Sequence, residues 1–132
     1  MELDYLAVLV ATIASFGAGA IWYSPLLFAK AWSAETGITD EKAKERSPAM
    51  VFGVSFVLTL IGAAAMDIFL DPASMGVLGC TMAGLCVGLI WVGGSVGVNY
   101  LFEHKSMRHW LITGGYHTVQ YTLIGLVLGY MS

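Results

Sequence analysis

Charged side chains are scarce in this chain, and their scarcity is its most informative feature. Only 11% of the 132 residues are Asp, Glu, Lys or Arg, whereas soluble domains carry roughly 25%. Hydrophobic residues make up 58% of the chain, and the mean hydropathy is +0.77. A soluble domain of this size would need far more polar surface. We therefore expect lipid to be the solvent for most of the chain, as a single transmembrane domain over residues 1–132.

Basic residues and catalytic motifs are also few. Six Lys and Arg against nine Asp and Glu give a net charge of -3, which disfavours nucleic-acid binding. Residues 93–97, Gly-Gly-Ser-Val-Gly, match Gly-x-Ser-x-Gly, but they lie inside a long apolar stretch and not at the strand-to-helix turn that this motif requires. The sequence has no glycine-rich phosphate loop and no His-Glu-x-x-His pattern. Cys80 and Cys86 lie six residues apart, on different faces of a helix, which excludes a local disulfide. We predict no enzymatic activity, no catalytic residues, no cofactor and no metal site.

Four almost uncharged stretches are long enough to cross a bilayer, which takes about 20 residues per helix. Their approximate bounds are residues 3–23, 49–70, 75–102 and 107–131. Because lipid offers the backbone no hydrogen bonds, each stretch is expected to be helical. The predicted fold is all-α: a polytopic membrane protein with four transmembrane helices in an up-down bundle. A kink is expected in the long third stretch at Gly93-Gly94.

The basic residues fall only in the first and third loops. They are Lys30, Lys42, Lys44, Arg46, Lys105 and Arg108. The positive-inside rule then predicts cytoplasmic loops one and three, with both termini outside. Loop one, residues 28–47, is predicted to form a short surface helix with Thr39 as its N-cap. Its charges fit a solvated face, and contact with lipid headgroups is the alternative.

Small residues recur at four-residue spacing, which lets helix backbones approach closely in lipid. The pairs are Gly84 and Gly88, Gly93 and Gly97, Gly125 and Gly129, and Ser15 and Gly19. They fit either packing within the bundle or a subunit interface. Because four short helices bury little surface together, we predict a homo-oligomer, with membrane lipid as the other partner.

Polar residues inside lipid are costly, so each is a functional candidate. Ser95, Asn99 and Glu103 form one helical stripe, and Thr113, His117 and Gln120 form another. An antiparallel hairpin turning near Ser106 would pair Glu103 with His109, Asn99 with Thr113, and Ser95 with His117. The sequence therefore predicts a polar seam between the third and fourth spans.

Two interpretations of the seam compete. In the structural one, its groups hydrogen-bond across the hairpin and hold it together. In the functional one, His117 is a titratable group at the end of a polar pathway for a proton or solute. A metal or haem site is a third interpretation. Asp67 and Asp71 share a face at the outer interface, as solvated carboxylates or, alternatively, as a cation site.

Two segments carry a family resemblance. They are Gly-Ala-Ile-Trp-Tyr-Ser-Pro-Leu-Leu-Phe at 19–28, with Lys30 and Trp32 after it, and Tyr-Leu-Phe-Glu at 100–103 followed by Thr-Gly-Gly-Tyr-His at 113–117. They resemble the opening and closing signatures of the bacterial membrane family called domain of unknown function 1761. Members usually carry Asn at the position of Thr113. The resemblance implies a four-helix integral membrane protein and no established activity. It draws attention to Trp22, Tyr23, Pro25, Glu103, Tyr116 and His117.

The leading functional prediction is a non-enzymatic protein of the bacterial inner membrane that binds or passes a small solute or proton along the seam. Its candidate binding residues are Ser95, Asn99, Glu103, Thr113, Tyr116, His117 and Gln120. The alternative is a structural or accessory protein that binds another membrane protein through glycine-rich helix faces. A membrane enzyme acting on lipid or quinone lacks a catalytic residue set.

Overall fold

The computed structural model describes residues 3–38 and 40–131, and this part of the chain is helical apart from its turns. The elements are α1 (Tyr5–Trp22), α2 (Ala29–Thr36), α3 (Asp40–Ala43), α4 (Pro48–Phe69), α5 (Pro72–Cys86), the π-helix η1 (Val87–Val92), α6 (Gly93–Phe102) and α7 (Met107–Met131). The all-α prediction is confirmed for the described residues, and a helix lies at each of the four predicted stretches.

Local sequence explains where the long helices begin. The Asp4 carboxylate accepts a hydrogen bond from the Ala7 N–H at 3.0 Å and so caps α1. Ser47 caps α4 in the same way, and Pro48 occupies its first turn, where no N–H is needed. Pro72 has the same role in α5. The caps satisfy backbone groups that lipid could not.

Loop one contains two short helices, α2 and α3, where one had been predicted. Gly37 ends α2 with φ of 69°, a left-handed conformation that suits glycine. The predicted N-cap, Thr39, lies outside the described residues. α3 is a single turn of four residues.

Three of the helical segments are both long and apolar enough to cross a membrane: α1, α4 and the continuous segment α5–η1–α6, residues 72–102. The 25-residue α7 reaches about 37 Å at about 1.5 Å per residue, but it is more polar and is not among these three. It is also the most enclosed helix, with contacts to α1, α5, η1 and α6. Its neighbours therefore shield the polar side chains that α7 carries.

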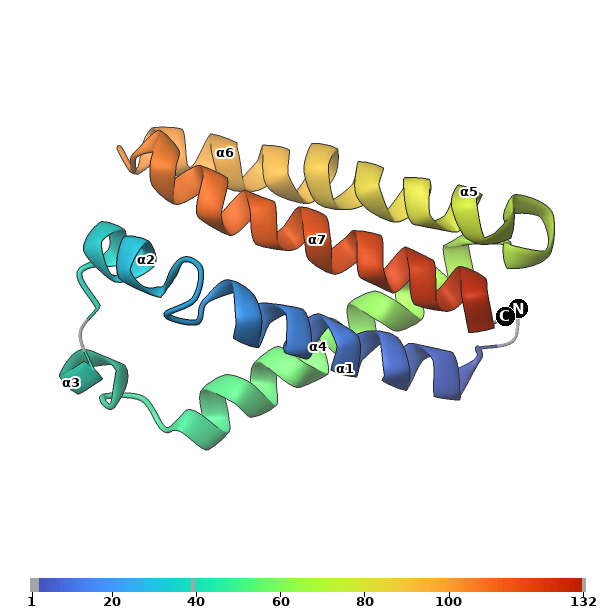
Figure 1. Ribbon diagram of the computed structural model, residues 1–132, viewed down its shortest axis with the longest axis horizontal. Coiled ribbons are helices and arrows are strands. Elements are labelled where there is room, and N and C mark those ends of the chain that lie inside the picture. The colour runs from blue at the N-terminus through green and yellow to red at the C-terminus, as the bar shows by residue number, and fades with distance from the viewer. Residues whose placement is uncertain (1–2, 39, 132) are drawn as a thin grey trace.

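Figure 1 shows α7 running alongside α5 and α6, with α1 nearby and α4 crossing α1 at an angle. α1 begins and α7 ends at one end of the molecule, whereas α2, α3 and the turn between α6 and α7 lie at the other. All six basic residues lie in or next to these segments: in α2, in α3 and the loop after it, in the turn between α6 and α7, and in the first turn of α7. We call this second end the basic end. α4 is buried only in its C-terminal half, at Ala63, Met66 and Asp67.

Glycines bring α5 and η1 onto α7. A Cβ added at Gly84 would collide with the Tyr121 carbonyl oxygen, and one at Gly125 would collide with the Cys80 carbonyl oxygen. Gly88 meets the backbone of α7 in the same way. The small-residue pairs therefore pack helices within this chain, which was one of the two alternatives their spacing had left open.

The π-helix keeps this glycine face aligned. Gly88 and Gly93 are five residues apart, and in a regular α-helix that step would rotate Gly93 about 140° from Gly88. The wider turn of η1 absorbs the extra residue, so Gly93 also faces α7. Its carbonyl oxygen accepts a hydrogen bond from Trp110 Nε1 at 2.9 Å. The kink predicted at Gly93-Gly94 is not found at Gly93, which keeps α-helical dihedral angles (φ -59°, ψ -41°). The non-helical backbone of this stretch is at Gly76 (φ 70°, ψ 178°), near the start of α5.

Candidate functional site

The polar stripe predicted on the third span does not meet α7. Ser95, Asn99 and Glu103 are exposed, meaning uncovered by the rest of the described chain. Glu103 forms an exposed ion pair with Lys105 at 3.9 Å. The predicted pairings of Asn99 with Thr113 and of Ser95 with His117 are therefore wrong, whereas Glu103 does interact electrostatically with His109.

Close packing explains the difference. The face of α6 that meets α7 carries Gly93, Gly97 and Tyr100, on the side opposite the predicted stripe. At Gly97 an added Cβ would lie 2.9 Å from Trp110 Nε1, so only glycine leaves room for the indole ring. In lipid, small residues let helices approach, whereas longer polar side chains would hold them apart.

Thr113 nevertheless lies at the centre of a polar cluster with different partners. The Tyr100 hydroxyl donates a hydrogen bond to Thr113 Oγ1 at 3.2 Å and lies 3.4 Å from His109 Nε2. Thr113 also forms a side-chain hydrogen bond with Tyr23 at the end of α1. We call these four residues the hydroxyl chain. It joins α1, α6 and α7 and begins at the basic end with His109, of which only 5% is exposed.

The other predicted residues of α7 face α1 or their own helix. The Tyr116 hydroxyl donates to the Ser15 carbonyl oxygen at 3.1 Å, and the Tyr116 ring packs edge-on against Tyr23 at 5.5 Å. His117 Nδ1 lies 2.9 Å from Gln120 Oε1. Tyr116 thus extends the hydroxyl chain by one aromatic contact toward the middle of α7.

Two tryptophans flank the hydroxyl chain. Trp22 Nε1 donates to the Ile112 carbonyl oxygen at 2.9 Å, and Gly115 leaves room for its ring. Trp110 packs against Gly97 of α6, and its Nε1 donates to the Gly93 carbonyl oxygen. Large aromatic rings with one bonded polar atom exclude water from the groups between them.

Sequence reasoning missed Tyr100 as the partner of both Thr113 and His109. One signal was available, because Gly93, Gly97 and Tyr100 are spaced i, i+4 and i+7 and share a face of a regular helix. If these glycines mark the face of α6 that packs on α7, Tyr100 is predicted to lie on that face as well.

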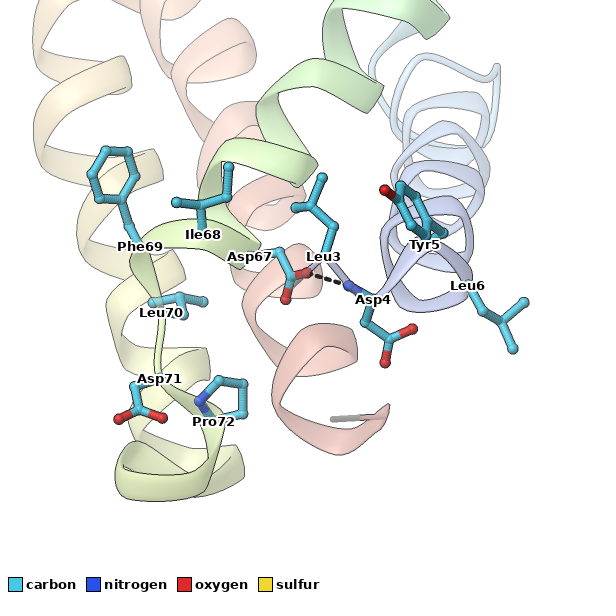
Figure 2. A pocket seen from close by; sticks show the side chains of 10 residues that line it. All are labelled: Leu3, Asp4, Tyr5, Leu6, Asp67, Ile68, Phe69, Leu70, Asp71 and Pro72. Carbon is cyan, nitrogen blue, oxygen red and sulfur yellow. Dashed lines mark hydrogen bonds between the residues drawn. The ribbon is translucent and has the colours of Figure 1, made fainter. Parts of the chain in front are cut away.

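The opposite end of the molecule holds a cavity of about 820 Å³ between the start of α1 and the turn from α4 to α5 (Figure 2). Asp67 is only 9% exposed there, and its Oδ2 accepts a hydrogen bond from the Asp4 N–H at 2.8 Å. The expectation of a solvated Asp67 is therefore wrong. Asp71 is exposed and bonded to Ser74. Asp67 ties the first turn of α1 to the end of α4.

Metal coordination has no support in the residues that the structure describes, where no group of three His, Cys, Asp or Glu side chains comes together. The hydroxyl chain offers three hydroxyl groups on tyrosine and threonine together with one imidazole. Such groups bind protons and small hydrogen-bonding molecules.

The comparisons with known proteins extend the sequence resemblance. The family model described as "Protein of unknown function (DUF1761)" matches residues 6–129, which include Trp22, Tyr23, Tyr100 and Thr113. The chain matches no curated protein and no solved structure. Because the matched region covers nearly the whole sequence, the chain belongs to the DUF1761 family.

Proposed function

We propose that the protein is a non-enzymatic, four-span bundle of the bacterial inner membrane, with α7 as its fourth and central transmembrane helix. The three long apolar segments supply lipid-facing spans, and α7 is long enough to cross beside them. The gathering of all six basic residues at one end supports a cytoplasmic basic end with both termini outside. The up-down order follows from this topology.

We further propose that this bundle binds a proton or a small hydrogen-bonding solute at the hydroxyl chain. The observation that carries the proposal is the linked series His109, Tyr100, Thr113 and Tyr23, which connects three helices in surroundings where polar groups are costly. His109 lies two residues inside the start of α7, so the series opens toward the cytoplasmic side.

Binding fits the geometry better than permeation through a single chain. Gln120 lies 13 residues beyond Met107, about 20 Å along the helix and near its middle. Beyond it α7 meets a tightly packed apolar core that includes Ala7, Ala11 and Leu128, all 0% exposed. The polar groups therefore end inside the bundle.

A pH titration of intrinsic tryptophan fluorescence tests the proposal in detergent or nanodiscs. Trp110 adjoins His109 in sequence, so we expect an emission change between about pH 5 and 8, where histidine titrates. His109→Gln should abolish the change. The exposed His104 supplies the matched control, and His104→Gln should retain it. A change that survives His109→Gln would contradict proton binding at this site.

The alternative, an accessory protein that binds a membrane partner, draws support from a surface other than the glycine faces, because α7 covers those glycines. Residues 48–55 of α4 are all exposed and include Met50, Val51, Phe52 and Val54. A second copy or another membrane protein would pack there. Crosslinking from Phe52 in native membranes distinguishes such a partner from lipid alone.

A further inference from the structure

A groove lined by α6, the turn after it and the start of α7 lies beside the hydroxyl chain, with Tyr100 common to both. Its volume is about 370 Å³, within the range of small-molecule sites. The lining residues are Gly94, Gly97, Tyr100, Leu101, Lys105, Ser106, Met107 and Trp110. We propose that the groove holds one acyl chain of an anionic phospholipid, with the lipid phosphate at Lys105.

The inner part of the groove fits an acyl chain. Its floor runs from Gly94 to Leu101, about 10 Å along α6 at about 1.5 Å per residue. Trp110 forms one wall, and its only polar atom is already bonded to Gly93, so an apolar ring surface remains. Gly94 has open space where a side chain would stand, with nothing within 4 Å of an added Cβ.

The outer part fits a phosphate. Lys105 is the only charged side chain in the lining, and its ammonium lies 4.6 Å from the centroid of the Tyr100 ring, at the loop end of the groove. Its ion pair with Glu103 is long and exposed, so it competes weakly with a phosphate. The Ser106 hydroxyl donates to Glu35 at 2.7 Å, which places that carboxylate beside the loop end of the groove, so Lys105 alone would hold the phosphate. Basic groups at the ends of transmembrane helices select anionic headgroups.

Native mass spectrometry of the full-length protein tests the proposal by titrating phosphatidylglycerol and phosphatidylcholine of the same chain length. We expect one retained phosphatidylglycerol, bound about five-fold more tightly than phosphatidylcholine, which is the preference one lysine supplies. Gly94→Leu should fill the groove and remove this lipid. Gly17→Leu is the matched control, because Gly17 is a helical, exposed glycine of α1 with equally open surroundings.

Lys105→Gln is a second variant for the same experiment, and it should not disturb helix packing because Lys105 is exposed. It should make the affinities for the two lipids equal, and it decides the question even if Gly94→Leu does not fold. The proposal is overturned if the wild type binds both lipids equally, or if folded Gly94→Leu and Gly17→Leu retain the lipid alike. A copurified lipid without a phosphate in the groove would also overturn it.

Discussion

Thr113 connects three helices through one hydroxyl group. It accepts a hydrogen bond from Tyr100 of α6 and bonds to Tyr23 at the end of α1. A side chain that both donates and accepts can link two tyrosine hydroxyls, which a hydrocarbon of the same shape cannot do. The Thr113 hydroxyl therefore has a structural role in addition to its place in the proposed site.

Thr113→Val should test this link at nearly constant volume. Interhelical hydrogen bonds in membranes average about 0.6 kcal/mol and reach about 1.7 kcal/mol, so we expect a loss of unfolding free energy in this range. The measurement is unfolding in mixed detergent micelles. Thr118→Val is the control, because the Thr118 hydroxyl bonds only to the Gly114 carbonyl within α7. Equal losses in the two variants would show that Thr113 does not join the helices.

At the scale of helices, apolar length in the sequence predicts the elements closely. The predicted stretch 107–131 coincides with α7, and 49–70 differs from α4 by one residue at each end. The glycine pairs also predicted close helix contacts. These features depend on composition and spacing alone, which are read directly from the chain.

The facing residues of α6 could not be predicted as readily. A regular helix has a fixed rotation per residue, whereas the wider turn of η1 takes up one additional residue before Gly93. The prediction also matched polar stripes to each other, but the glycines decide which faces meet. The polar partners of α7 therefore came from Tyr100 and Tyr23 rather than from Ser95 and Asn99.

Two glycines of the same long helical segment give a matched test of this packing. Gly84→Ala would push a methyl group into the backbone of α7, and we expect destabilisation of about 1–3 kcal/mol from overpacking. Gly94→Ala meets nothing and should be neutral or raise stability by up to about 1 kcal/mol, since alanine favours helix. Thermal unfolding followed by circular dichroism measures both. Similar effects at the two positions would contradict the packing role of Gly84.

In the whole molecule, polar side chains of α7 lie inside and apolar side chains lie outside, which is the reverse of the arrangement in a soluble protein. The least apolar long helix, α7, lies among the others, and its polar groups face α1 and α6. Lipid explains this order, because apolar segments can remain uncovered while polar groups need partners within the bundle. The proposed function and topology both depend on α7 crossing the membrane.

The most direct test of this claim is cysteine labelling at the two ends of α7 in intact cells, with Cys80→Ala and Cys86→Ser as background. Met107 and Tyr130 are both exposed, so cysteines there are reachable by a membrane-impermeant maleimide. We predict that Tyr130→Cys is labelled from outside and Met107→Cys only after the membrane is permeabilised. Labelling of both positions from the same side would contradict the account.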